Sequence, residues 1–296
     1  MRNLVHPAHM LARRILTATG LSKPFRRYLG PIAGRVLANV ASKPGLTSIV
    51  RGHQMYLAPP GGFPPLALAL DQYEVGTTRL IESILRPGMV FVDAGAHVGY
   101  YTLIAAGLVG PQGRVYAFEP DPANHEILVK NIEVNGYTNI TPIRSALSNR
   151  PGTASLHITS LDTGRHSLYR QNIPLKGQVE VAVTTLDTFL GTQGWPQVDL
   201  IKMDVEGAEQ DVLDGMSEIL EKTPQPKLVL EFNPSLLSKA GVGLSEFLDR
   251  FSSWGMDVQW VNEDQGLMRL NDGGRSALVA DLLSHDRSMN LFCSVQ

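Results

Sequence analysis

Three absences narrow the classes of protein to which this 296-residue chain can belong. It has one cysteine, Cys293, so an internal disulfide and a cysteine-rich zinc site are excluded. No apolar run approaches the ~20 residues that a membrane-spanning helix needs. The start of the chain lacks the continuous apolar segment of a secretory signal. We therefore expect a cytoplasmic protein, and 43% apolar residues are enough to build a substantial core.

Acidic residues are also absent from residues 1–70, which carry nine Lys or Arg. The rest of the chain carries 17 basic and 28 acidic side chains. Apolar residues recur at roughly helical spacing through the basic segment, which predicts a helical arm over 1–47 ahead of one domain over 48–296. Two interpretations of the arm stay open. It packs on the body or on a partner subunit of a homo-oligomer, or it rests as a peripheral amphipathic helix on an anionic membrane.

Short apolar runs alternate with helical patterns over the second segment. This alternation predicts an α/β fold with a mostly parallel, doubly wound sheet. Two alternating segments, 153–158 and 179–184, interrupt the pattern and predict an inserted β-hairpin, whose polar loop is expected to contact substrate. Strands are predicted near 89–92, 115–118, 139–143, 198–204, 227–232, 256–261 and 290–295, and helices near 73–85, 99–108, 122–134, 206–220 and 244–251.

The turn after the first of these strands contains a glycine motif that indicates a class of ligand. Asp93, Gly95 and Gly99 form a D-x-G-x-x-x-G loop. A dinucleotide-binding turn reads G-x-G-x-x-G, and its second glycine lets the backbone approach a pyrophosphate. His97 occupies that position here. The turn therefore favours a nucleoside ligand without a pyrophosphate, such as S-adenosylmethionine (SAM), and an ordinary strand-to-helix turn is the alternative.

A second acid stands at the end of the next strand. Glu119 follows Gly99 by 20 residues, where a carboxylate can accept hydrogen bonds from both ribose hydroxyls. Further acids, Asp204, Glu206 and Glu231, follow later strands, and parallel strands bring their carboxyl ends to one edge of the sheet. Such an edge attracts a sulfonium and repels a polyphosphate, and no phosphate-binding G-x-x-x-x-G-K-[ST] loop is present.

Methyl transfer to a hydroxyl requires alignment of the reactants and removal of a proton. Candidate bases are Asp204, Glu206, Glu231 and His166. Lys202 shares a strand face with Asp204, where it either holds a substrate oxygen or neutralises the carboxylates. The three acids also offer oxygen ligands for Mg²⁺, but we favour a site without metal. In that interpretation Asp204 packs near the methionine end of SAM and Glu206 caps the next helix.

Taken in order, these motifs resemble the FkbM-type methyltransferase family, a branch of the class I SAM-dependent methyltransferases. The resemblance covers roughly residues 50–235. It rests on Tyr73-Glu74, the run from Val92 to Thr102, Ala117-Phe118-Glu119-Pro120, Asn131 with Asn135, Ser145-Ala146-Leu147, Thr185-Leu186-Asp187, and the run from Ile201 to Glu209. The family often has Asn where this chain has His97.

The resemblance implies a Rossmann-like sheet of seven strands with the last strand antiparallel. It also implies SAM-dependent O-methylation of a hydroxyl on a sugar, glycolipid, polyketide or related metabolite. By this analogy Asp93 and Gly95 lie under the methionine part, Glu119 holds the ribose, and Ser145 lies beside the adenine. The predicted cofactor residues are Glu74, Asp93, Gly95, Ala96, His97, Gly99, Tyr100, Glu119, Pro120, Ser145, Ala146 and Asp204, and the predicted catalytic residues are Lys202, Asp204, Glu206 and Glu231.

Two other functional interpretations stay open. One is a non-catalytic binding or scaffold protein with the same fold. The other is a nucleic-acid methyltransferase that uses the basic arm. The chain has no N-P-P-Y motif, however, and Asn233-Pro234-Ser235 matches that motif only in part. We therefore expect a small-molecule or glycan acceptor and no nucleic-acid partner.

Overall fold

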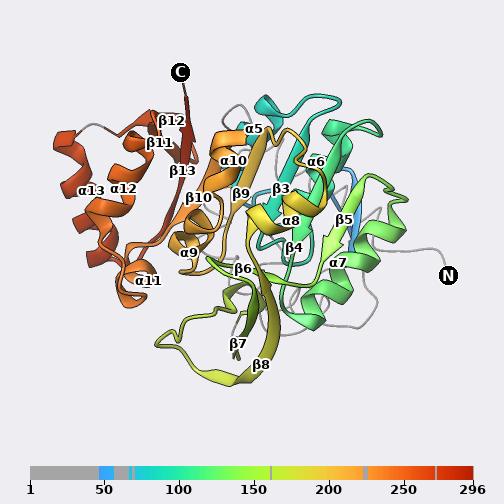
Figure 1. Ribbon diagram of the computed structural model, residues 1–296, viewed down its shortest axis with the longest axis horizontal. Coiled ribbons are helices and arrows are strands. Elements are labelled where there is room, and N and C mark those ends of the chain that lie inside the picture. Colours follow the sequence, from blue (N-terminus) through green and yellow to red (C-terminus); the bar gives the residue numbers. More distant parts are fainter. Residues whose placement is uncertain are drawn as a thin grey trace, which may run out of the picture.

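The computed structural model describes residues 47–56, 67–68, 71–160, 162–222, 226–270 and 272–295. The predicted basic arm falls almost entirely outside this part of the chain. The remainder forms three layers, with helices on both faces of a twisted central sheet (Figure 1). The prediction of a doubly wound α/β domain is confirmed.

The central sheet has the order β12-β11-β13-β10-β9-β3-β4-β5. Strands β5, β4, β3, β9 and β10 are parallel, and β13 runs antiparallel between β10 and β11. The seven predicted strands, including the antiparallel last one, are thus present, and the short edge strand β12 adds an eighth. The strands are β3 (Val90–Ala94), β4 (Arg114–Phe118), β5 (Ile140–Ile143), β9 (Leu200–Met203), β10 (Lys227–Phe232), β11 (Asp257–Asn262), β12 (Gly266–Arg269) and β13 (Met289–Ser294).

Two hydrophobic cores lie on opposite faces of this sheet. Successive side chains of a strand point to opposite faces, so Phe91 enters one core and Val92 the other. This two-sided burial explains why the strands are continuous apolar runs rather than alternating ones. One core contains side chains of α5 (Val75–Ile84), α6 (Tyr100–Val109) and α7 (Pro122–Val134), and the other contains side chains of α8 (Leu186–Thr192), α9 (Glu209–Asp214), α10 (Ser217–Lys222), α11 (Pro234–Lys239), α12 (Leu244–Ser253) and α13 (Asp272–Ser284).

One predicted helix is divided in two. The sequence pattern predicts a single helix up to about Leu220, but α9 and α10 are separate. The break lies at Gly215, where a Cβ atom would stand 2.2 Å from the backbone oxygen of Ser148. The chain that leads into the hairpin passes so close to this point that the helix cannot continue with an ordinary side chain there.

Two smaller sheets complete the fold. The predicted hairpin is confirmed as β7 (Gly152–Thr159) and β8 (Leu175–Thr184), which form a three-stranded sheet with β6 (Ala146–Leu147). This sheet projects below the central one, beside the carboxyl ends of its parallel strands (Figure 1). A short 3₁₀ helix, η1 (Thr163–Arg165), lies in the hairpin loop, and β1 (Thr47–Val50) pairs with β2 (His53–Tyr56).

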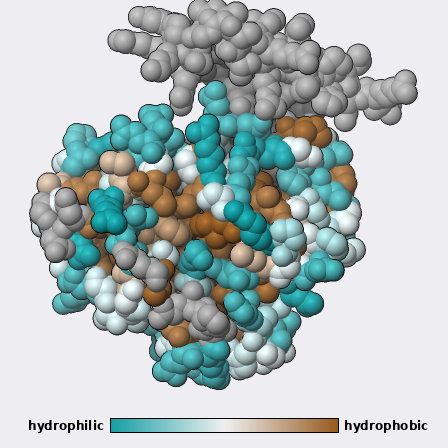
Figure 2. All heavy atoms as spheres, turned by 90° about the horizontal axis from the view of Figure 1, so that it is seen from above, coloured by the Kyte–Doolittle hydropathy of each residue, from teal (hydrophilic) through white to brown (hydrophobic). Residues whose placement is uncertain are grey.

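Hydrophobic and hydrophilic residues are both exposed on the surface seen from above. Hydrophobic atoms gather toward the middle of that face and hydrophilic atoms surround them (Figure 2). Within the described ranges, no helix combines the length and the apolar character that crossing a bilayer demands.

Candidate cofactor and active site

A cavity of about 210 Å³ opens at the carboxyl ends of the parallel strands. Every predicted cofactor and catalytic residue lines it except Gly99. The order β5-β4-β3-β9-β10 places Glu119 on one side of the central turn and Asp204 with Glu231 on the other. The cavity therefore has two chemically distinct ends, one near Glu119 and one near the later carboxylates.

The central turn is held in an unusual backbone conformation. Gly95, His97 and Gly99 all have positive φ, at 86°, 50° and 96°. A Cβ atom at Gly95 would stand 1.9 Å from the backbone oxygen of Asp204, so only glycine fits there. Histidine is among the few other residues that enter the left-handed region with some frequency. Gly99, also predicted to bind the cofactor, lies outside the cavity lining, and a Cβ atom there would stand 2.7 Å from Leu128 Cδ1.

Glu119 is fixed by two backbone amides. The N–H groups of His97 and Asp121 donate to its two carboxylate oxygens at 2.8 and 2.9 Å. The side chain is only 5% exposed, and burial raises its pKa to about 8 although these hydrogen bonds act in the opposite direction. A carboxylate has about four lone-pair sites, so acceptor capacity remains for a ligand in the cavity.

Asp93 lies under the middle of the cavity at the end of β3. The hydroxyl of Thr102 donates to it at 2.6 Å. Burial raises the pKa of Asp93 to about 6, while this hydrogen bond and the charge of Lys202 lower it. The aspartate can therefore be ionised at neutral pH and face the positive part of a ligand.

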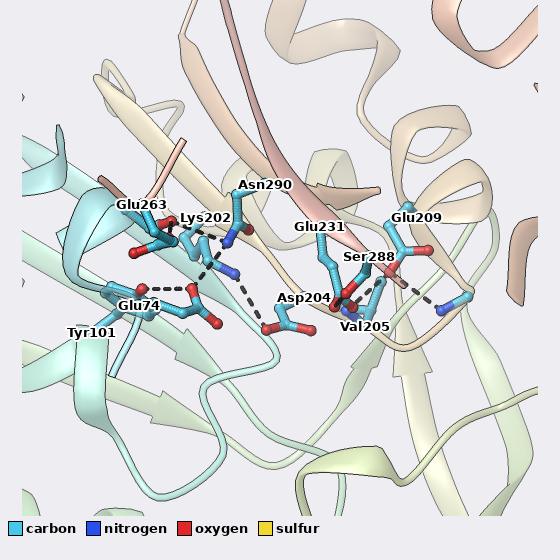
Figure 3. Close-up of polar contacts among 12 residues, drawn as sticks. Glu74, Tyr101, Lys202, Asp204, Val205, Glu209, Glu231, Glu263, Ser288 and Asn290 are labelled. Carbon is cyan, nitrogen blue, oxygen red and sulfur yellow. Dashed lines mark hydrogen bonds and ion pairs between the residues drawn. The ribbon is translucent and has the colours of Figure 1, made fainter. Parts of the chain in front are cut away.

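Lys202 is a buried cation at the other end of the cavity. Its Nζ lies 3.3 Å from Asp204 Oδ2 and 5.4 Å from the centre of the Tyr101 ring. Burial disfavours its charged form, but the charges of Asp204, Glu74 and Glu231 dominate and raise its pKa. Figure 3 shows its ammonium directed toward Asp204, beside Glu74. Lys202 therefore stays protonated and compensates the surrounding carboxylates.

Glu74 joins this cluster from the start of α5. Its Oε2 accepts hydrogen bonds from the hydroxyl of Tyr101 at 2.7 Å and from the amide of Asn290 at 3.0 Å. Burial raises the pKa of Glu74. Its backbone has a positive φ of 37°, as do those of His97 and Glu206 in the same lining. Strained backbone of this kind collects at functional sites.

Three carboxylates meet at the ends of β9 and β10. Ligand oxygens of Asp204, Glu206 and Glu231 lie within 4.8 Å of one another. Burial and then the charge of Asp204 raise the pKa of Glu206 to about 8 and that of Glu231 well above its usual value. Ser288 donates to Glu231 Oε1 at 2.6 Å. The arrangement offers proton acceptors, and oxygen donors that a hard cation uses, with Lys202 supplying a positive charge beside Asp204.

The loop that carries Asp204 and Glu206 is shaped by a residue that the predicted set missed. Oε1 of the buried Glu209 accepts hydrogen bonds from the N–H groups of Val205 and Gly207, both at 3.2 Å. The backbone-binding role that sequence reasoning offered to Glu206 therefore belongs to Glu209. The position of Glu209 at the start of a helix was the available signal.

The hairpin loop closes the Glu119 end of the cavity. Thr163 Oγ1 lies 2.9 Å from His97 Nε2, and its backbone oxygen accepts from the Asn124 amide at 3.1 Å. Neither Thr163 nor Asn124 was predicted, because their approach depends on the packing of an insertion. His166 also lines the cavity, but its Nδ1 already accepts from the Thr159 N–H at 3.2 Å. Burial and the nearby His166 lower the pKa of His97 to about 3.

The fold and the cavity together define a class of protein. An open doubly wound sheet, a glycine turn without a pyrophosphate cradle and acids at neighbouring strand ends describe a Rossmann-like protein with a nucleoside-type site. The particular family follows from comparison. The chain belongs to the FkbM methyltransferase family, because the model of the methyltransferase FkbM domain matches residues 93–257.

Individual relatives share about 30% sequence identity or less with this chain. Methyltransferase 1 of Beauveria bassiana is 31% identical over 145 residues, which are 43% of this chain and 58% of that protein. The 2-O-methyltransferase NoeI of Sinorhizobium fredii is 27% identical over 203 residues, 64% of this chain and 82% of NoeI. The hexuronic acid methyltransferase AglP of Haloferax volcanii is 27% identical over 149 residues, 50% of this chain and 58% of AglP.

The chain thus spans 58% of the length of two of these three relatives. Among solved structures, methyltransferase FkbM from Methylobacillus flagellatus superposes with a TM-score of 0.42 at 15% identity, covering 76% of this chain and 54% of that one.

Proposed function

We propose that the protein is a SAM-dependent O-methyltransferase that acts on a hydroxyl of a sugar or a related small metabolite. The family match and the names of NoeI and AglP support this assignment. The observation that carries it is the placement of Asp93 and Glu119 at adjacent strand ends in one cavity, with Lys202, Asp204 and Glu231 at its far side.

The residues present fit SAM. Glu119, fixed by two amides, retains acceptor capacity for ribose hydroxyls. Apolar side chains of Leu147 and Leu156 line the same end and suit an adenine ring. Asp93 and the later carboxylates give the methionine end a negative environment. When bound, SAM supplies an electrophilic methyl group on a sulfonium.

The chain itself must position the acceptor and take its proton. Asp204, Glu206 and Glu231 are the acids close to one another at the far end of the cavity. We assign the proton-accepting role to Glu231, since a raised pKa brings a carboxylate closer to the basicity of a general base at neutral pH. Lys202 holds Asp204 in place and balances the negative charge.

The cofactor assignment is tested by calorimetric titration of Glu119→Ala with SAM. The titration is run above pH 8, where Glu119 is ionised. Charge-assisted hydrogen bonds contribute about 1.5–3 kcal/mol each, so loss of the ribose contacts should weaken binding about 100-fold or more. Glu126→Ala is a matched control, because Glu126 lies exposed on α7. Circular dichroism should show both variants folded. Unchanged affinity of folded Glu119→Ala would refute the assignment.

A further inference from the structure

A second cavity, of about 720 Å³, adjoins the first at the same edge of the sheet. Glu74 and Glu231 line both cavities. The second cavity lies on the β10, β13 and β11 side, and Glu119 lies on the opposite side, at the end of β4. If the nucleoside part of SAM is held near Glu119, this second cavity opens from the end left for the acceptor.

Most of the wall of this second cavity comes from late in the chain. Most of its lining residues come from β11, the turn after it, α13 and the residues from Arg287 to Asn290, and the others from around the start of α5 and from Glu231. The family match ends at residue 257. The wall is therefore built by a segment that the shared domain does not include, where acceptor preference can differ between relatives.

The charge of the wall argues against an anionic ligand. Five lining side chains are acidic and two are arginines. Arg287 is already in an ion pair with Asp281, and the exposed Asp264 adds a negative charge at the rim. Even with Glu74 and Glu231 left out of the count, because burial raises their pKa values, the remaining acids Glu263, Asp264 and Asp281 outnumber the two arginines. A carboxylate or phosphate that enters this cavity would therefore meet a net negative charge, which disfavours its binding.

The wall combines apolar side chains with side chains that form hydrogen bonds. Trp260 packs with Leu278 and Met289 in one hydrophobic cluster, and all three line the cavity. The same lining includes the polar side chains of Ser288, Asn290 and Glu231, and Figure 3 shows Ser288 beside Glu231. An aromatic or apolar face beside a few placed polar groups is what binding of a compact polar ring requires.

Glu231 supplies a specific reason to expect a hydroxyl. Its Oε1 accepts the hydrogen bond from Ser288, whereas its buried Oε2 has no hydrogen-bond partner among the residues that the structure describes. Buried polar atoms are nearly always paired in native proteins. A ligand hydroxyl brought to this carboxyl group would supply the missing donor.

We propose that the second cavity is the acceptor site, and that it takes a hydroxyl-rich ring without negative charge, such as a neutral or amino monosaccharide unit. The inference rests on the proposed function. Trp260 packs against the face of the ring, and Glu231, which lines both cavities, receives the hydroxyl to be methylated. Uronic acids and phosphorylated sugars are the disfavoured acceptors.

Binding is tested by saturation-transfer NMR on the full chain loaded with S-adenosylhomocysteine. The probes are methyl α-glucoside, methyl glucosaminide and methyl glucuronide at equal concentration. We expect at least threefold stronger signals from the first two, loss of these signals in Trp260→Ala, and no change in Leu267→Ala, an exposed position on β12. A stronger glucuronide signal, no glycoside signal, or signals that survive Trp260→Ala would each overturn the proposal.

A charge reversal covers the case in which Trp260→Ala fails to fold. Asp264→Arg should shift the ratio of glucuronide to glucoside signal at least threefold toward glucuronide, and Glu180→Arg, exposed on β8 outside both linings, should not. An unchanged ratio in Asp264→Arg contradicts the acceptor site. Calorimetry with SAM separates the two failures. If the chain binds SAM but shows none of these NMR effects, only the acceptor site is refuted. If the chain does not bind SAM, the proposed function is refuted.

Discussion

At the scale of single residues, the carboxyl groups around the cavity have pKa values well above those of the same groups in water. Burial raises the pKa of Glu119 and of Glu206 to about 8, and Lys202 stays charged because acids surround it. Perturbed groups that converge on one cavity are typical of catalytic sites. Under the proposed function, Glu231 accepts a proton at one end of the cavity and Glu119 holds the ribose at the other.

The raised pKa values predict that methyl transfer accelerates as pH rises. Below its pKa a carboxyl group is neutral and cannot accept a proton, and the pKa of Glu231 is raised well above its usual value, so kcat should still increase with pH through the neutral range, by up to about tenfold per pH unit. The measurement is kcat at saturating SAM, which removes any titration of Glu119 in the free protein. Glu231→Gln should lower kcat about 100-fold or more and flatten the profile. A flat profile in the unaltered protein would contradict this assignment.

Metal removal gives an independent test of the acidic cluster. We expect EDTA to leave methyl transfer within about twofold of its original rate, because Lys202 already supplies a positive charge 3.3 Å from Asp204. The assay compares turnover before and after dialysis against the chelator. Loss of activity that added Mg²⁺ restores would instead make Asp204, Glu206 and Glu231 metal ligands.

At the scale of elements, α7 holds β2 through two asparagines. Asn131 accepts from the Tyr56 N–H at 2.6 Å and donates to the Tyr56 oxygen at 3.1 Å. Asn135 repeats this pairing one turn later with the backbone of Gln54. The two side chains act like a neighbouring strand for β2, and Asn131 also donates to Val98 in the central turn at 2.8 Å. The spacing Asn131 with Asn135 therefore has a structural explanation.

This docking predicts a specific loss of stability. Asn131 is fully buried, and Asn131→Ala leaves backbone groups of Tyr56 and Val98 without partners. Each fully buried group of this kind costs about 1–3 kcal/mol. Only the Val98 oxygen is fully buried, whereas water can replace part of the loss at the half-buried Tyr56, so the free energy of unfolding should fall by roughly 2–4 kcal/mol in urea titration. Asn149→Ala, at an exposed hydrogen bond, should change it by less than about 0.5 kcal/mol. A similar small change in Asn131→Ala would show that β2 is held by other contacts.

At the scale of the whole molecule, the last strand of the chain inserts between two strands that precede it. β13 pairs on one side with β10 and on the other with β11, so residues near 290 lie beside residues near 230 and 260. The same strand brings Asn290 to Glu74, 216 residues earlier in the chain. The cavity wall and the core on that side therefore depend on a segment that folds into place between two others.

Truncation tests this dependence. A chain that ends at Asp286 lacks β13, which exposes two strand edges and removes the core side chains Leu291 and Cys293. We expect no cooperative thermal unfolding transition, because β11 and β12 lose the pairing that connects them to the five parallel strands. A chain that ends at Ser294 keeps the strand and should unfold cooperatively. A sharp transition in the shorter chain would mean that the parallel half is stable alone.

The amino-acid sequence by itself determined the parallel strands, the central turn and the acids at the strand ends. Those signals are local: an apolar run, the D-x-G-x-x-x-G spacing, and a carboxylate at the residue where a strand stops. Gly95, Glu119 and Asp204 could be named on that basis. Only the tertiary structure decided that Glu209 holds the Asp204 loop, that Thr163 reaches His97, that a glycine divides α9 from α10, and that a second cavity opens beside Glu231. These features join residues far apart in the chain, and their contacts depend on how whole surfaces pack, which no local pattern records.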